Sequence, residues 1–398
     1  MILRGRAGQY TMIGSYRCFD PAPLPPNPPL ELTEKLVVAL SSADTALARL
    51  DGATHQLPDP ELFVYAFMRQ EAVLSSQIEG TQASLEDVLG FEAQPDAVDK
   101  TDDITEVINY LNAIKWGLEQ LDQLPVAGRL LKGIHMRLLA EGRGSEKSPG
   151  EFRNSQNWIG QPGRPIEEAI FVPPAIPLMH DAFAKWEMFI NSEYTLPPLI
   201  KFALAHAQFE TIHPFWDGNG RLGRMIITLL LCKEKILARP TLYLSLYFKQ
   251  RREEYYQLLQ ATRDQGDWES WVLFFLRGVE VTSKAALNTA FAIARLKETF
   301  LNDAQAHMSS KKAPLLAEKL FSRPYLNVSM AASILATSYP TASSIVEQFV
   351  DAGYLVQINL RSRSKTYGFK PYLDILHEGA GDLNGIISGE DHLAVNEG

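Results

Sequence analysis

Two apolar helices joined by a short glycine-rich loop most constrain what this chain can fold into. Residues 199–210 carry apolar side chains at helical spacing without a breaker, and residues 224–235 repeat that pattern. Pro214 ends the first helix, because the residue before a proline is disfavoured in helical backbone angles. Residues 218–220 form a tight turn that opens the second helix. The sequence therefore predicts a helical pair whose connecting loop exposes backbone N–H groups.

The connecting loop has the residue types that bind phosphate groups. Its turn consists of Gly218, Asn219 and Gly220, whose successive N–H groups can form a concave anion site. Arg221 and Arg224 lie three residues apart, so they share one face of the first helical turn. Both guanidinium groups can bind one polyphosphate through paired hydrogen bonds.

Two further residues of the loop favour chemistry on the bound phosphate. Asp217 precedes the turn and is placed to hold Mg²⁺, and His213 can accept a proton near neutral pH. Each residue alone has an ordinary explanation: the turn can be only a turn, Asp217 a helix cap, and His213 a packed side chain. Their occurrence together, in this order, favours a phosphate-processing site.

The run from His213 to Arg224 resembles the signature of the Fic family, whose members attach the AMP half of ATP to protein hydroxyl groups. The resemblance implies that His213 deprotonates the target hydroxyl and that Asp217 binds Mg²⁺. It assigns ATP binding to Gly218, Asn219, Gly220, Arg221, Leu222, Gly223 and Arg224. Related Doc-type kinases lack the second glycine of the turn, so Gly220 favours AMP transfer. UMP or phosphocholine as the transferred group stays open.

A second pattern, Ser75 to Glu79 and Gly80, resembles the inhibitory motif of the same family. It follows the apolar-periodic stretch 62–74, which predicts a helix with Gly80 at its C-terminal cap. The resemblance implies that Glu79 pairs with Arg224 and restrains ATP binding. In some relatives the corresponding glutamate helps water remove AMP, so a reverse reaction stays open. A solvated glutamate on a helix is the alternative.

Residues 150–177 are similar to the family's flap, a β-hairpin beside the catalytic histidine. Two short apolar runs around a Pro-Gly loop at residues 161–165 predict this hairpin. The resemblance implies that a target segment docks on Ile170, Phe171 and Val172 as an added strand. An ordinary surface hairpin is the alternative. Tyr255, in the aromatic-rich stretch 243–256, is the candidate for an adenine pocket, with plain helix packing as its alternative.

Composition places the chain among globular proteins. Of 398 residues, 46% are hydrophobic and 21% charged, and the formal net charge of -9 argues against unspecific coating of nucleic acid. Only Cys18 and Cys232 occur, which excludes a disulfide scaffold and suits the cytoplasm. We expect no signal peptide, no membrane span and no membrane partner, because no apolar run is long enough.

The predicted fold is mainly α: a Fic-type helical bundle with a β-hairpin flap and a C-terminal winged helix-turn-helix domain. We expect an N-terminal helical region with the inhibitory motif (1–100), a catalytic domain (101–305), the winged helix (306–378) and a flexible acidic tail (379–398). An extended, proline-rich lead-in covers residues 19–29. Residues 30–89 read as helices, with loops at Asp51-Gly52 and at residues 58–60.

The C-terminal region predicts three helices and two strands. The helices cover residues 315–321, 329–335 with Ser329 as cap, and 341–350; the strands cover 354–358 and 365–369 around a wing loop. Residues 311–378 hold eight basic and five acidic residues, a net charge of +3. That charge permits DNA binding, although such domains also bind proteins or dimerise, so a homodimer stays open. The rival to an enzyme is a DNA-binding regulator whose Fic-like domain senses nucleotide.

Overall fold

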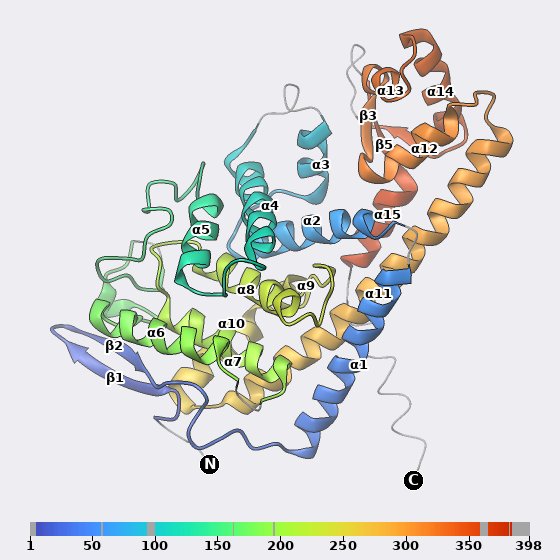
Figure 1. Ribbon diagram of the computed structural model, residues 1–398. Coiled ribbons are helices and arrows are strands. Elements are labelled where there is room, and N and C mark those ends of the chain that lie inside the picture. The colour runs from blue at the N-terminus through green and yellow to red at the C-terminus, as the bar shows by residue number, and fades with distance from the viewer. Residues whose placement is uncertain are drawn as a thin grey trace.

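The computed structural model describes residues 5–56, 59–93, 100–161, 163–193, 196–358, 365–381 and 383. Within them the fold is mainly helical, as predicted (Figure 1). Its helices are α1 (Glu34–Gln56), α2 (Pro60–Ile78), α3 (Leu85–Ala93), α4 (Asp102–Gln120), α5 (Gly128–Leu138), α6 (Ile176–Asn191), α7 (Pro198–Ile212), α8 (Asn219–Lys233), α9 (Ser245–Gln250), α10 (Arg252–Gln265), α11 (Trp268–His307), α12 (Ala313–Ser322), α13 (Val328–Ile334), α14 (Tyr339–Asp351) and α15 (Lys370–Gly379). None of these described helices is long and apolar enough to cross a bilayer.

The predicted helical pair, α7 and α8, forms the centre of the bundle. Almost every residue of α7 is buried, since a helix that is apolar on all sides needs neighbours on all sides. It packs against α6, α8 and α11, while α8 also contacts α2, α4 and α5. The loop between α7 and α8 is therefore held on a rigid scaffold.

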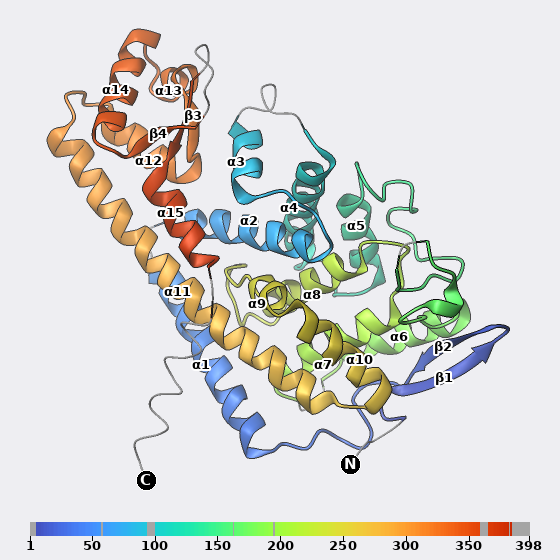
Figure 2. The ribbon, with the colours of Figure 1, turned by 180° about the vertical axis from the view of Figure 1, so that it is seen from behind.

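Helices α1 and α11 lie side by side along one flank of the bundle (Figures 1 and 2). The loop predicted at Asp51-Gly52 is wrong, because α1 continues through both residues to Gln56. Leu47 and Leu50 are fully buried on this side of α1, and their packing outweighs the low helix propensity of Gly52.

The N-terminus holds a hairpin that the sequence analysis missed. Strands β1 (Gly8–Ile13) and β2 (Tyr16–Pro21) pair antiparallel and project from the bundle in both ribbon views. The predicted extended lead-in is thus wrong at its start, where residues 19–21 belong to β2. Strand β2 also meets the flap, as the Phe19 N–H donates to the Val172 carbonyl at 2.9 Å.

The C-terminal region lies at the far end of α11 (Figure 1). It has the order α12, β3 (Tyr325–Asn327), α13, α14, β4 (Leu355–Gln357), β5 (Thr366–Phe369) and α15, with an antiparallel sheet ordered β3-β5-β4. Strand β3 and helix α15 were not predicted. Asn327, not Ser329, caps α13, because its side chain accepts from the Met330 N–H.

Several expectations fall outside the described residues. They are Pro58 in the loop expected at 58–60, the wing loop at 359–364, Pro162 in the flap loop, and residues 382 and 384–398 of the expected acidic tail. The boundary expected at residue 305 falls in the last turn of α11. The domain limits and the winged-helix assignment stay predictions.

Candidate active site

The loop from His213 to Gly218 begins and ends in left-handed backbone conformations. His213 ends α7 with φ 49°, and its N–H still donates to the Phe209 carbonyl at 2.9 Å. Gly218 precedes α8 with φ 73°, a conformation that glycine adopts without steric cost. The loop between α7 and α8 is thus bounded by two residues in left-handed conformations.

Asn219 clamps this loop rather than pointing its side chain at a ligand. Its Oδ1 accepts from the Phe215 N–H at 2.9 Å, and its Nδ2 donates to the Phe215 carbonyl at 2.8 Å. The side chain is buried, so both bonds are shielded from water. Any contribution of Asn219 to anion binding therefore comes from its backbone N–H.

We expect Asn219→Ala to lower the free energy of unfolding by about 2 kcal/mol, because the buried Phe215 N–H loses its acceptor while the Phe215 carbonyl keeps its bond from Asn157. Thermal and urea unfolding would measure the loss. Asn157→Ala is the matched comparison, since Asn157 gives only one bond to the same Phe215 carbonyl, at 3.0 Å. An equal loss in both variants would contradict the role of Asn219 as the main clamp.

His213 is a half-buried, neutral imidazole on the cavity wall. Burial, then the charges of Arg153 and Arg263, lower the pKa of His213 to about 3. Its Nδ1 has no hydrogen-bond partner among the described residues. Arg153 fixes the backbone here by donating from Nε to the His213 carbonyl at 3.0 Å. A neutral imidazole can accept a proton at pH 7.

A cavity of about 510 Å³ opens beside this loop. Predicted site residues on its wall are Glu79, Ile170, Phe171, His213, Asp217, Gly218, Asn219, Gly220, Arg221, Arg224 and Tyr255. Five others are not among its lining residues: Ser75, Gly80, Val172, Leu222 and Gly223. The chain thus brings most of the predicted site together around one hollow.

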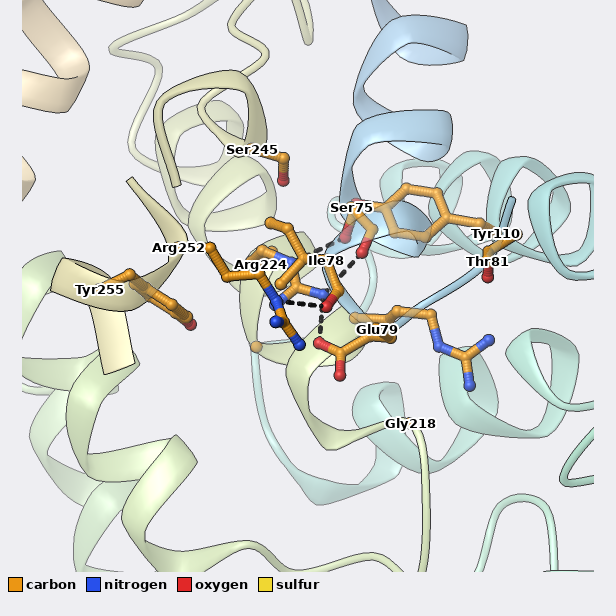
Figure 3. A network of polar contacts seen from close by, with 12 residues as sticks. Ser75, Ile78, Glu79, Thr81, Tyr110, Gly218, Arg224, Ser245, Arg252 and Tyr255 are labelled. Carbon is orange, nitrogen blue, oxygen red and sulfur yellow. Dashed lines mark hydrogen bonds and ion pairs between the residues drawn. The ribbon is translucent and has the colours of Figure 1, made fainter. Parts of the chain in front are cut away.

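Arg224 is bound by the end of α2 (Figure 3). Its Nη2 donates to Glu79 Oε1 at 2.6 Å and to the Ser75 carbonyl at 2.9 Å, and its Nε donates to Ser75 Oγ at 2.8 Å. The Glu79 side chain is 32% exposed, whereas that of Arg224 is 2% exposed. The carboxylate therefore covers the guanidinium from the cavity side.

The electrostatic environment favours the charged forms of both members of this pair. Burial acts to raise the pKa of Glu79, but Arg224 outweighs it and the pKa is lowered. Burial likewise opposes the charge of Arg224, and Glu79 raises the pKa of the guanidinium above its ordinary value. Gly220 permits the contact, since a Cβ there would lie 2.2 Å from Glu79 Oε1.

Asp217 and Arg221 lie close to each other on the cavity wall. Asp217 Oδ1 accepts from the Gly218 N–H at 2.6 Å, and its side chain is 41% exposed. Arg221 is buried, and its Nη2 lies 3.8 Å from Asp217 Oδ1. No group of three or more His, Cys, Asp or Glu suited to a metal occurs among the described residues. Proteins nevertheless commonly bind Mg²⁺ through only one or two carboxylates together with the phosphates of the substrate.

Tyr255 lines the cavity but is buried within an aromatic cluster. Its ring stacks on Phe248 at 4.7 Å between centroids, and its hydroxyl bonds with His206 Nε2 at 2.9 Å. Both the adenine-pocket and the packing interpretations of Tyr255 are therefore compatible with its position. Tyr256, one residue on, is 39% exposed and also lines the cavity.

The flap contains less β-structure than predicted. Ile159 and Phe171 form one isolated antiparallel bridge, and a short 3₁₀ turn, Ile166–Glu168, lies in the connection. Phe171 is buried against Arg263, whereas Ile170 is 68% exposed. Both bridged residues, Ile159 and Phe171, nevertheless line the cavity.

Sequence reasoning missed several charged residues around the site. Arg153 and Glu106 come from distant elements, and no local pattern identifies them. Glu210 lies one helical turn before His213 and lines the cavity, a spacing that could have identified it. Burial raises the pKa of Glu210 to about 7, and its Oε1 has no partner among the described residues.

Comparison with known families and proteins agrees with this geometry. The model of the Fic/DOC family N-terminal region matches residues 37–119, and that of the Fic/DOC family matches residues 125–231. Proteins named protein adenylyltransferase Fic from Drosophila willistoni and Drosophila melanogaster are each 28% identical to the chain, over 256 and 259 residues. Each match covers 63% of this chain and 47% or 48% of the relative, so the chain spans about half the length of these relatives.

Solved structures show the same fold. A Fic family protein from Desulfovibrio desulfuricans superposes with a TM-score of 0.56 at 20% identity, covering 86% of this chain and 98% of its own. A Fic domain containing signaling protein from Bacteroides thetaiotaomicron gives 0.52 at 15% identity, covering 64% and 97%. The chain thus carries a Fic/DOC family N-terminal region at residues 37–119 and a Fic/DOC family domain at residues 125–231, which together supply most of the cavity's predicted site residues.

Proposed function

We propose that the chain is a protein adenylyltransferase that moves AMP from ATP to Ser, Thr or Tyr hydroxyls of target proteins and of itself. One observation carries the proposal: a neutral His213, the N-terminus of α8 and two motif arginines line the same cavity. The names of the matched relatives support it.

In the proposed reaction His213 takes the proton of the target hydroxyl, whose oxygen attacks the α-phosphorus of ATP. A new P–O bond to the target forms, the bond to the bridging β-phosphate oxygen breaks, and pyrophosphate leaves. The N–H groups at the start of α8, with Arg221 and Arg224, bind the phosphates and stabilise the charge of the transition state.

Asp217 is the residue that would hold Mg²⁺. The ion supplies charge neutralisation of the polyphosphate when it is bound. The partly exposed Asp217 carboxylate stays oriented by the Gly218 N–H, which fixes its position on the cavity wall. We expect chelation of Mg²⁺ to abolish transfer.

Glu79 is proposed to restrain the reaction. Its carboxylate occupies the Arg224 guanidinium that the γ-phosphate needs, and it adds a negative charge on the cavity wall. ATP would bind weakly or with its α-phosphate turned away from His213. A second role proposed for Glu79 is in the reverse reaction, where its carboxylate would help water remove AMP from a modified protein.

The mouth of the cavity is proposed to receive the target. Ile170 is exposed there beside the bridged flap, so an extended target segment can add to the flap backbone at Ile170, while the Val172 carbonyl already accepts from the Phe19 N–H of β2. Tyr255 and its exposed neighbour Tyr256 are proposed to line the adenine side.

The C-terminal region is proposed to be a winged helix, which the order α12-β3-α13-α14-β4-β5 supports. DNA binding through it would make the chain a regulator, but α14 has no Arg or Lys between Tyr339 and Asp351. The absence of basic side chains on α14 favours protein binding or dimerisation as the role of this domain. Titrating labelled DNA against salt distinguishes the two.

The test uses ATP labelled on the α-phosphorus, with Mg²⁺ and cell lysate, and three forms of the full chain. We expect weak labelling of protein by the wild type, strong labelling by Glu79→Gly, and none by Glu79→Gly with His213→Ala. Labelling absent from all three would refute AMP transfer, and UTP labelled on its α-phosphorus or CDP-choline labelled on the phosphorus of its phosphocholine group would then be tried as donors.

A further inference from the structure

A second buried carboxylate binds the other motif arginine. Glu106 lies on α4, 115 residues before Arg221, and its Oε2 lies 3.3 Å from Arg221 Nη1. The side chains are 1% and 3% exposed. An ion pair so well shielded fixes the position of both groups, because separating them would leave two uncompensated charges.

Glu106 and Glu79 approach their arginines from different sides. Glu79 is on the cavity wall, whereas Glu106 is not among the residues that line the cavity, although Arg221 is. Glu106 therefore holds Arg221 from behind and leaves its cavity side open. Arg221 lines the cavity, and its buried Nε has no partner among the described residues.

Glu106 is itself held by two neighbours. Thr81 Oγ1 donates to Glu106 Oε2 at 2.6 Å, and Arg143 Nε lies 2.7 Å from Glu106 Oε1. Arg143 is 52% exposed and lies outside the cavity lining, so it balances charge from the solvent side. Thr81 follows Glu79 by two residues. The segment that carries the inhibitory carboxylate therefore also contacts Glu106, the residue that binds Arg221.

We infer that Glu106 is a positioning residue for phosphate binding, which aims the Arg221 guanidinium into the cavity. The inference rests on the proposed use of ATP. It gives the segment of residues 37–119, which carries both Glu79 and Glu106, a supporting role in addition to its inhibitory one. Removing that whole segment would then free Arg224 but release Arg221, whereas Glu79→Gly frees Arg224 alone.

Calorimetric titration of Mg-ATP into the full-length Glu79→Gly chain tests the role without requiring transfer. Adding Glu106→Gln should weaken ATP binding about tenfold, the value of one hydrogen bond to a charged group. Arg143→Ala, the matched control on the same carboxylate, should change the affinity less than about twofold, as exposed ion pairs contribute little. Glu106→Asp keeps the negative charge but moves the carboxylate away from Arg221, so the loss of ATP affinity should be intermediate.

A double-mutant cycle separates positioning from general damage. In an Arg221→Ala background, Glu106→Gln should cost no further affinity, since the residue it positions is gone. Unchanged ATP affinity in Glu106→Gln, or the same loss with and without Arg221, would overturn the inference. ATP binding absent from Glu79→Gly itself would instead refute the proposed function, so the two failures are distinguishable.

Discussion

The Glu79→Gly variant is expected to transfer AMP about a hundredfold faster than the wild-type chain at subsaturating ATP. Two charges 4 Å apart interact by about 4 kcal/mol at an effective dielectric constant of about 20. Solvent at the 32% exposed Glu79 screens part of this, leaving about 2–3 kcal/mol. Each 1.4 kcal/mol corresponds to a factor of about ten. Initial rates of α-phosphate label incorporation measure the ratio.

Two comparison variants identify which property of Glu79 matters. Glu79→Gln keeps the shape and removes the charge, so it should recover most of the gain. Ser75→Ala removes one hydrogen bond to Arg224 Nε but leaves the Glu79 pair, so its rate should rise by much less. A Glu79→Gly rate equal to that of the wild type would show that Glu79 does not restrain transfer.

The local shape of the catalytic loop could be predicted because its determinants are contiguous. Pro214 follows the end of α7 and Gly218 precedes the start of α8, and both act through backbone sterics alone. The pairing of Glu79 with Arg224 could be anticipated only from the resemblance, since 145 residues separate them. The structure places the two groups 2.6 Å apart.

The supporting charges could not be predicted in this way. Glu106 reaches Arg221, and Arg153 reaches the His213 carbonyl, only because α4 and the flap pack on the central helices. Helical or strand periodicity carries no information about such contacts. The β1–β2 hairpin is different: Gly14-Ser15 between two short runs is a recognisable turn signal, with Gly14 at φ 61°. The proline-rich stretch that follows favours an extended segment, and its pattern masks the strand at residues 19–21.

Replacing His213 by alanine in the Glu79→Gly chain is expected to lower transfer by about a hundredfold to ten-thousandfold, the usual contribution of a general base. ATP affinity should change little, so the loss falls on kcat rather than on binding. His206 is the matched control. Burial also lowers the pKa of His206 to about 3, but the Gly223 carbonyl and the Tyr255 hydroxyl occupy both of its nitrogens.

His206→Gln should therefore alter stability far more than the chemical step, in contrast to His213→Ala. If the two variants lost kcat equally, a special role for His213 as base would be untenable.

The same environment sets the pH range in which His213 can act. A histidine whose pKa is lowered from 6.5 to about 3 is neutral, and able to accept a proton, throughout the neutral range. As the pH falls from about 6.5 towards 3, the unfolded chain binds a proton at this histidine while the folded chain does not. The free energy of unfolding therefore decreases over that pH range. NMR titration of the Glu79→Gly chain, with His213→Ala to assign the resonance, should place the His213 midpoint below about pH 5. A midpoint near 6.5 would mean that the site is open to water, and that the base depends on bound ATP and target to become shielded.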